Sequence, residues 1–492
     1  MNVAVFSPYA TVVPHFETEL DIAQQHLDAG DQVEFLNCTG QLANCDFNPN
    51  REPERCQQCL GRRNMGLELL TSETPQPQHA QFTAIEDIPN SRHETLRTKF
   101  ESVEQLIDYR IEEFDIGYAV LSSVVSICRD PEPDLEQHQE LVERFATTAW
   151  QTYWQSLDFL AQRQSQNKPI DRVYVFNGRF SAMRAVFRAC QKMQVDCYLH
   201  ERGCDGKHYE LFENHLLHDL AMIEKAIRDR WEEAASSPDR EQVASDWFHD
   251  RVNRVEATWH SFVKDQQLKK LPDEFDPNQK NISIFTSSDD EFVSIGKAWQ
   301  NDVYPNQLVA IDSIARDLHQ RQPDTQIYLR VHPNLKDVEN KRLSDMFALD
   351  YPNLTVIRPG ATIDTYALIG ASDTVVSFGS SVGSEAIFWD KPSVLLGPCF
   401  YQNLGGVYRS RSHEQTIDLL CQTLAPQDKT GALMYGYWLR TRGLKHKYFQ
   451  STGLFDGTFK QQTLYARPTN SPSKLKRLRR KVRKLFGKMR EG

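Results

Sequence analysis

The sequence predicts an α/β protein built from two doubly wound, Rossmann-like domains that face a central cleft. Three observations lead to this prediction. The chain has 492 residues, which is more than one ordinary hydrophobic core accommodates. Short apolar strands alternate with amphipathic helices in both halves, which is the pattern of parallel sheets covered by helices. A charged run with two prolines, residues 269–277, separates the halves and is typical of a linker.

The apolar runs of the first half lack the alternation of a strand with one solvated face. We therefore expect strands that are buried on both faces. Their expected positions are 3–6, 32–36, 172–176 and 196–199, with helices at 16–29 and 182–191. Residues 93–165 predict further helices, and a long helical stretch is expected at 216–264.

The second half repeats the same order of elements. Strands are expected at 282–285, 326–331, 354–357, 374–377 and 393–396, with helices at 306–320, 362–369 and 383–389. The predicted division is an N-terminal domain 1–268, a linker 269–280, a C-terminal domain 281–465 and a tail 466–492. Two such domains place their ligands between the carboxyl ends of the two sheets.

The composition is that of a soluble globular protein, with 40% hydrophobic and 25% charged residues. Residues 1–6 lack the basic region of an export signal, and no window approaches the roughly 20 apolar residues of a membrane span. We therefore expect a cytoplasmic protein. The net charge is −10 although the C-terminal tail is basic, so the body is strongly acidic. An acidic body argues against nucleic acid as a partner.

The strongest local signal is Arg330-Val331-His332-Pro333, which ends a predicted strand. A histidine held by the following proline at the carboxyl end of a strand can point into the cleft. There it would hold a phosphate oxygen or protonate a leaving phosphate, and we expect Arg330 and Pro333 to belong to the same nucleotide phosphate site. The alternative is a loop histidine with a structural hydrogen bond.

A second signal follows the strand predicted at 374–377. The turn contains Ser380 and Ser381, and a helix that starts with Gly383, Ser384 and Glu385 follows it. Hydroxyls and free backbone N–H groups at this place predict a nucleotide phosphate site. Glu385 would accept hydrogen bonds from a ribose or complete a capping box. The alternative is an ordinary helix cap.

A third signal lies at the ends of two strands in the first half. Glu201 ends one of them, where a general base would deprotonate an acceptor hydroxyl. The alternative is a surface glutamate paired with Arg202. Asn177 and Arg179 follow the neighbouring strand, and His15 follows the first loop of the chain. We expect these residues and Arg202 to hold the acceptor.

Together, Glu201-Arg202-Gly203, His332-Pro333 and Ser380-Ser381 resemble the short motifs of bacterial capsule polysaccharide biosynthesis proteins. That family includes sialyltransferases and Kdo transferases that use CMP-activated sugars. The resemblance covers residues 170–400 and departs from the family pattern at Arg202, where an acid is expected. It implies the GT-B fold and an inverting glycosyltransferase that needs no catalytic metal. No Asp-x-Asp motif is present to hold a divalent cation.

By that resemblance, Glu201 is the catalytic base, His332 the phosphate ligand or acid, and Ser380 and Ser381 phosphate ligands. The expected partners are a nucleotide-sugar donor and a polysaccharide or lipid-linked glycan acceptor. The same motif pair also resembles teichoic-acid polyol-phosphate transferases with CDP-activated donors. A nucleotide-sugar epimerase on the same fold and a non-catalytic scaffold of polysaccharide assembly are also compatible with the sequence.

Four cysteines cluster outside these motifs. Cys38, Cys45, Cys56 and Cys59 lie within 22 residues and include one Cys-x-x-Cys pair. Four thiolates at such spacing predict a structural zinc that staples a long loop. An iron–sulfur cluster and four unconnected thiols are the alternatives.

The basic tail carries a second pattern. Between 474 and 490, apolar residues recur every three or four positions among Lys and Arg. This pattern predicts an amphipathic helix on the anionic inner leaflet, where lipid-linked acceptors reside. A disordered basic tail and a nucleic-acid patch are the alternatives.

Overall fold

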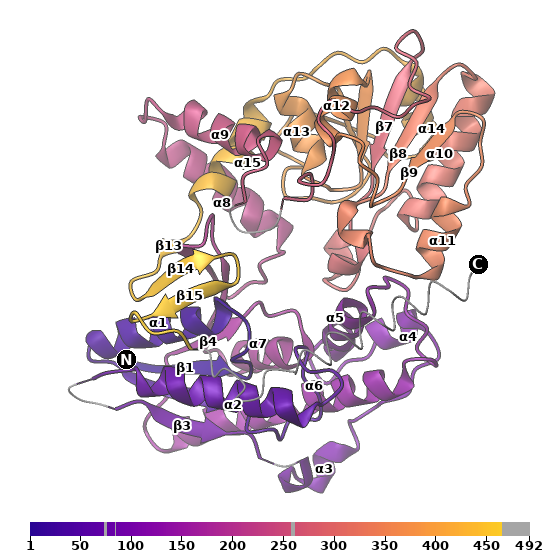
Figure 1. Cartoon of the computed structure of the whole chain (residues 1–492). Helices are drawn as coiled ribbons and strands as arrows, with labels where there is room; N and C mark the ends of the chain where they lie inside the picture. The colour runs from indigo at the N-terminus through magenta and orange to yellow at the C-terminus, as the bar shows by residue number, and fades with distance from the viewer. Residues whose placement is uncertain (73–75, 84, 257–260, 465–492) are drawn as a thin grey trace, which may run out of the picture.

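The computed structural model describes residues 1–72, 76–83, 85–256 and 261–464. The chain folds into two α/β lobes, one above the other in Figure 1, each around its own sheet. The amphipathic tail helix predicted at 474–490 lies outside the described residues. Within the described ranges, no helix combines the length and the apolar character that crossing a membrane requires.

The first lobe contains a seven-stranded sheet in the order β13-β6-β5-β4-β1-β2-β3. The five strands from β3 to β5 in this order run parallel, whereas β6 and β13 are antiparallel to their neighbours. The strands are β1 Asn2–Ser7, β2 Gln32–Asn37, β3 Gln78–Gln81, β4 Arg172–Phe176, β5 Asp196–Arg202, β6 His208–Glu213 and β13 Leu444–Lys445.

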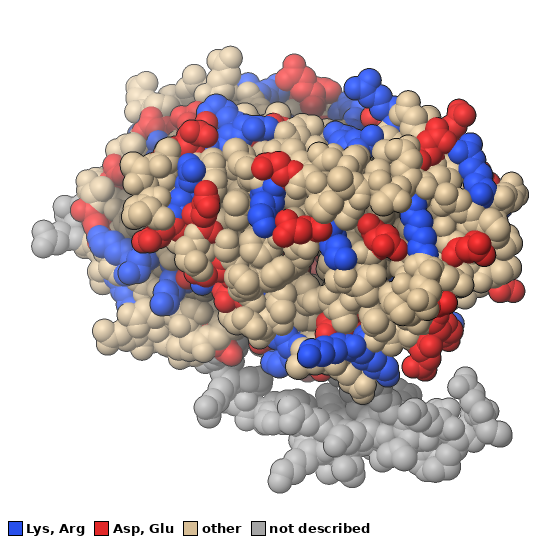
Figure 2. All heavy atoms as spheres, turned by 90° about the horizontal axis from the view of Figure 1, so that it is seen from above, with Lys and Arg blue, Asp and Glu red and all other residues tan. Residues whose placement is uncertain are grey.

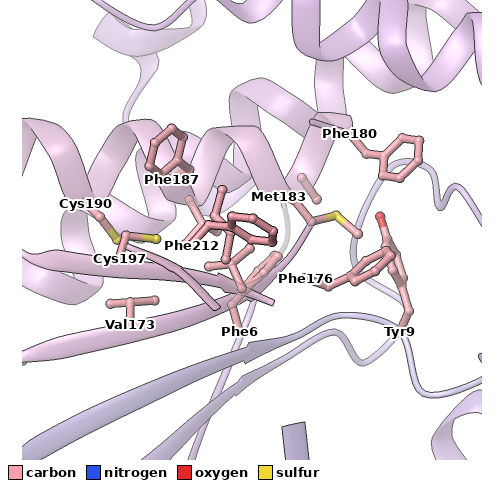
Figure 3. Packing of buried hydrophobic residues seen from close by; sticks show 14 of the residues in the cluster. Phe6, Tyr9, Val173, Phe176, Phe180, Met183, Phe187, Cys190, Cys197 and Phe212 are labelled. Atoms are coloured by element: carbon pink, nitrogen blue, oxygen red, sulfur yellow. The ribbon is translucent and has the colours of Figure 1, made fainter. Parts of the chain in front are cut away.

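The helices of this lobe are α1 His15–Asp28, α2 Pro53–Glu68, α3 Asn90–His93, α4 Val103–Ile107, α5 Ile116–Cys128, α6 Gln139–Ser165 and α7 Ser181–Met193. The helix α1 packs on one face of the sheet and α7 on the other. Figure 3 shows the core between the sheet and α7, where Met183 and Phe187 of the helix lie over Phe6 and Phe176 of the strands. Burial on both faces explains the nearly uninterrupted apolar strands of the sequence.

The second lobe contains a six-stranded, fully parallel sheet in the order β12-β11-β10-β7-β8-β9. Its strands are β7 Asn281–Phe285, β8 Gln326–Arg330, β9 Leu354–Ile357, β10 Thr374–Ser377, β11 Ser393–Leu395 and β12 Val407–Arg409. Its helices are α10 Gln307–Arg321, α11 Lys341–Phe347, α12 Thr365–Ala371, α13 Val382–Phe388 and α14 His413–Cys421. The strand order reverses between β7 and β10, which is where such sheets bind ligands. On the face seen from above, acidic and basic side chains are interspersed (Figure 2).

Two predictions about chain organisation are wrong. The stretch 216–264 is not one helix, because Pro238 separates α8 Leu220–Glu233 from α9 Arg240–Val252, and both pack on α15 Thr430–Thr441. The second lobe also does not extend to 465. β13 joins the first lobe's sheet, and the hairpin of β14 Phe449–Gly453 and β15 Asp456–Phe459 packs on α1.

Candidate active site

The first lobe contributes the turns that follow β4 and β5. Asn177 and Gly178 adopt left-handed backbone angles, with φ of 58° and 81°, directly after β4. A Cβ atom at Gly178 would lie 2.4 Å from Leu199 Cδ1, so only glycine fits there. This tight turn brings the side chain of Asn177 to the end of β5, where Glu201 lies.

Glu201 is held by two N–H donors. The amide of Asn177 donates to its Oε2 at 2.8 Å, and the backbone N–H of Arg202 donates to its Oε1 at 3.0 Å. Burial alone would raise the pKa of Glu201, but the nearby His15 and these donors lower it. The carboxylate is therefore ionised at neutral pH.

His15 lies beside Glu201, with its Nδ1 3.9 Å from Oε1. Its ring rests on Phe176, with 4.0 Å between the ring centroids. Burial lowers the pKa of His15 to about 3, so the ring is neutral at pH 7.

Arg202 and Arg179, both predicted acceptor ligands, have different surroundings. The guanidinium of Arg202 donates to the carbonyls of Val13 and Leu454, at 2.7 and 2.9 Å, and so ties the β1–α1 loop to the β14–β15 hairpin. The structure thus places it on backbone carbonyls behind the site. Arg179 instead reaches across the lobes, where its guanidinium donates to the carbonyl of Glu291 at 2.9 Å.

On the second lobe, His332 follows β8 and is fixed from two sides. Its backbone N–H donates to Thr286 Oγ1 at 2.9 Å, and its Nδ1 accepts the backbone N–H of Asn334 at 3.2 Å. Since Nδ1 is an acceptor, the ring proton resides on Nε2. Burial, together with Arg251, Arg129 and Arg330, lowers the pKa of His332 to about 4. His332 is therefore a neutral hydrogen-bond donor at pH 7.

The turn after β10 presents the predicted serines. Gly379 has a φ of 101°, and a Cβ there would lie 2.5 Å from the carbonyl oxygen of Pro398. Ser380 Oγ accepts the backbone N–H of Val382 at 3.4 Å. Ser381 does not cap the helix through its side chain, because its hydroxyl donates to Glu385 Oε1 at 2.9 Å. The ordinary helix cap is thus not the role of Ser381.

Glu385 is 1% exposed and is occupied by protein donors. Its carboxylate accepts the hydroxyls of Ser381 and Tyr366, the latter at 2.6 Å, and the Nε of Arg251 at 3.0 Å. It therefore organises the turn rather than offering itself to a ribose or completing a capping box. The contact with Glu385 holds Arg251 of α9 at the serine turn, where Nη2 of Arg251 lies 3.5 Å from Ser381 Oγ.

Other residues predicted for the phosphate site support it from behind. Arg330 is 2% exposed, and its guanidinium donates to the carbonyls of Arg358 and Ala361. Ser384 is fully buried and donates to the carbonyl of Ser381 at 2.8 Å. A Cβ at Gly383 would lie 2.3 Å from the hydroxyl of Tyr401. Pro333 begins the short helix that follows His332.

A cavity of about 190 Å³ opens between these second-lobe residues. His332, Ser380 and Ser381 line one side of it, and Phe292 and Trp299, stacked at 4.7 Å, line another. Glu291 also lines the cavity. Its carboxylate accepts the side-chain amide of Asn334 at 3.2 Å, and its backbone carbonyl accepts the guanidinium of Arg179 from the first lobe.

Polar contacts thus run from Glu201 across the lobes to the His332 cavity. They pass through Asn177, which accepts the backbone N–H of Arg179 at 3.3 Å, and then through Arg179 to Glu291. Reasoning from the sequence missed Arg251, Glu291 and the aromatic pair of Phe292 and Trp299. None of them lies within a motif, and only the fold brings them to the strand ends.

The predicted cysteine set lies elsewhere in the first lobe. Cys56 and Cys59 are on α2, not in a loop, while Cys38 and Cys45 lie in the connection between β2 and α2. All four line a second cavity beside the β1–α1 loop. Within the described part of the chain, the one group of three close metal-ligating side chains is Cys204, Asp205 and His208. The structural zinc stays a prediction.

No protein-family model matches the chain, and no curated protein matches its sequence. Among solved structures, it is similar to KpsC of Thermosulfurimonas dismutans, a β-Kdo 2,4 transferase, at 13% identity over 54% of this chain and 79% of that chain, with a TM-score of 0.38. It is also similar to UDP-GlcNAc 2-epimerase from Neisseria meningitidis, at 11% identity over 89% and 97% of the chains, with a TM-score of 0.27.

A third similar structure is MurG of Acinetobacter baumannii, at 12% identity over 89% of this chain and 94% of that chain, with a TM-score of 0.27. All three TM-scores lie below 0.5, so these likenesses support no statement about the activity of this chain.

Proposed function

We propose that this chain is an inverting GT-B glycosyltransferase that moves a sugar from a nucleotide donor to a glycan acceptor. One observation carries the proposal. An ionised carboxylate, Glu201, lies on the first lobe, and a cavity lined by His332 and two serines lies on the second, joined by the contact from Arg179 to Glu291. This arrangement separates a base from a phosphate site across the two lobes.

Glu201 is the proposed base. It would accept the proton of an acceptor hydroxyl while that oxygen attacks the anomeric carbon of the donor sugar. The N–H groups of Asn177 and Arg202 orient the carboxylate and keep it ionised before the attack. His15, neutral and in contact with the ring of Phe176, would act as a donor or acceptor toward the acceptor sugar.

His332, Ser380, Ser381 and Arg251 are the proposed phosphate ligands. As the glycosidic bond breaks, negative charge grows on the departing nucleotide phosphate, and fixed donors stabilise that charge. The Nε2–H of His332 is a neutral donor, because the ring is not protonated at pH 7. Arg251 supplies the positive charge that His332 lacks, 3.5 Å from Ser381.

We further propose a CMP-activated sugar such as Kdo or a sialic-acid-like sugar as donor, and a capsule polysaccharide or lipid-linked glycan at the inner membrane surface as acceptor. The resemblance of the three motifs supports this choice. CDP-, UDP- and GDP-linked donors would fit the same phosphate ligands, so a binding experiment has to distinguish them from a CMP-linked donor.

The first experiment is a thermal-shift screen of the full chain with CMP, CDP, UDP and GDP. A ligand at 100 times its dissociation constant stabilises the folded state by about 2.7 kcal/mol. A shift with CMP that disappears in His332→Ala supports the proposal. His319→Ala is the matched control, because His319 lies in the last turn of α10, which leads into the amino end of β8, whereas His332 follows the carboxyl end of that strand.

Transfer is then measured with the nucleotide-sugar that binds. Glu201→Gln is expected to keep the thermal shift and to lose turnover by about 10²- to 10⁴-fold, as for the removal of a general base. A shift with UDP or GDP alone would replace the proposed donor. The absence of any shift with all four nucleotides would favour a scaffold and would overturn the proposed transfer.

A further inference from the structure

The cysteine cavity of the first lobe has the make-up of a metal centre. It measures about 620 Å³ and is lined by Cys38, Cys45, Cys56 and Cys59, together with residues of the β1–α1 loop. All four thiols are half-buried. Cys56 and Cys59 are three residues apart on α2, which places both sulfurs on the same side of the helix.

The spacing of the sulfurs does not suit one zinc ion. Four thiolates around zinc, each with a Zn–S distance of about 2.3 Å in a tetrahedron, lie about 3.8 Å from one another. Among the described residues, no three of these four sulfurs lie within 4.8 Å of one another. They surround a cavity instead of converging on a point. A cluster of several iron and sulfide ions separates its four ligands in this way, because each thiolate binds a different iron.

Three of the four sulfurs already accept N–H groups. The backbone N–H of Gly40 donates to Cys38 Sγ, that of Ala10 donates to Cys59 Sγ, and the side-chain amide of Asn48 donates to Cys56 Sγ, each at 3.3 Å. Hydrogen bonds of this kind stabilise thiolates and tune the potential of iron–sulfur clusters.

Positive charge surrounds the same cavity. Arg51 and Arg55 line it, and Nη2 of Arg63 lies 3.8 Å from Cys59 Sγ. Four thiolates bring a net negative charge to a cluster, and guanidinium groups at its edge offset that charge. A dry pocket for an apolar ligand would not require two arginines in its lining.

We propose that Cys38, Cys45, Cys56 and Cys59 ligate an iron–sulfur cluster of the four-iron, four-sulfide type. The cluster has a positioning role. Arg62 and Arg63 of α2 donate to the carbonyls of Ala10 and Pro8, so the helix that carries two ligands also holds the β1–α1 loop. That loop leads directly to His15, beside Glu201. The cluster itself does not depend on the proposed sugar transfer, because its detection requires no substrate.

The test is metal and sulfide analysis of the full chain, produced in iron-replete cells and purified without oxygen. We expect about four irons and four acid-labile sulfides per chain, with a broad visible absorption that bleaches on reduction. One zinc per chain with no sulfide would overturn the cluster. A chain with neither iron nor zinc would overturn any metal role for the four cysteines.

Variants test the ligands. Cys56→Ser is expected to lose most of the iron and sulfide, whereas Cys128→Ser, at the end of α5, keeps both. Retention of the full cluster in Cys56→Ser would overturn the assignment. Asn48→Ala leaves all four ligands and removes one N–H donor, so its cluster should form and show a more negative reduction potential. An unchanged potential would contradict the proposed geometry.

Discussion

Arg251 donates from Nε to the carboxylate of Glu385 at 3.0 Å, although 134 residues separate them in the chain. Glu385 is 1% exposed and also receives the hydroxyls of Tyr366 and Ser381. This pair fastens α9 to the serine turn. It places a cation where neither the His-Pro motif nor the serine motif supplies one.

The first prediction concerns this pair. Arg251→Ala is expected to weaken nucleotide binding by about 10- to 100-fold, since a charge-assisted hydrogen bond contributes about 1.5–3 kcal/mol. Isothermal titration with the nucleotide that shifts the melting temperature measures the change. Arg316→Ala, on the exposed face of α10, is the control. Equal affinities of the two variants would exclude Arg251 from the phosphate site.

The second prediction is a pH profile of turnover. A base must be ionised to act, so the rate falls as the pH falls through its pKa. The pKa of Glu201 lies below its ordinary value of 4.5, because His15 and two N–H donors together outweigh the effect of burial, which raises it. We therefore expect no acid limb between pH 5 and 8. A limb near pH 6.5 would instead indicate a histidine base.

The third prediction concerns stability at acidic pH. Burial lowers the pKa of His332 to about 4, whereas an unfolded histidine titrates near 6.5. Below pH 6.5 the unfolded state therefore binds more protons, and stability falls as the pH decreases toward 4. The variant His332→Gln should lack this contribution. Between pH 7 and pH 4.5 its free energy of unfolding should therefore fall by about 2 kcal/mol less than that of the unmodified protein. Urea unfolding at both pH values measures the free energy of unfolding, and an equal pH dependence in both proteins would contradict the burial of His332.

The fourth prediction concerns the contact between the lobes. Asp115 is held by the guanidinium groups of Arg184 and Arg188, and Arg184 also donates to the carbonyl of Ile295 in the second lobe. Asp115→Ala leaves the buried Arg184 without its partner and should cost about 3–5 kcal/mol. Asp158→Ala, whose side chain is 54% exposed, should cost less than about 1 kcal/mol. Thermal unfolding of both variants measures the two losses of stability, and equal losses would contradict the prediction.

Much of the fold could be predicted because buried parallel strands leave a strong signal. The run 172–176 is β4, and the strands expected at 354–357 and 374–377 are β9 and β10. Helices of the second lobe begin within a few residues of their predicted starts. The seven-stranded sheet could not be completed in the same way, because β13 has two residues and its partner is set by packing alone.

The candidate site was predictable only where a motif follows a strand. His332, Ser380, Ser381 and Glu201 lie at strand ends, and the structure places them in the two facing lobes. The direction in which a side chain points at the end of a strand cannot be predicted from the sequence. Arg330 ends β8, yet its guanidinium points to the carbonyls of Arg358 and Ala361. Arg251 was missed since its partners are more than 100 residues away.

The return of residues 444–464 to the first lobe has a consequence for synthesis. His446 bonds to Thr18 of α1, and the backbone N–H groups of Tyr448 and Phe449 donate to Asp21. The first lobe is therefore made of two separate pieces of chain, and its final piece leaves the ribosome only after the entire second lobe. The first lobe to be translated is the last to be completed. A fragment that stops before 444 would expose the bare edge of β6 and the buried acids of α1.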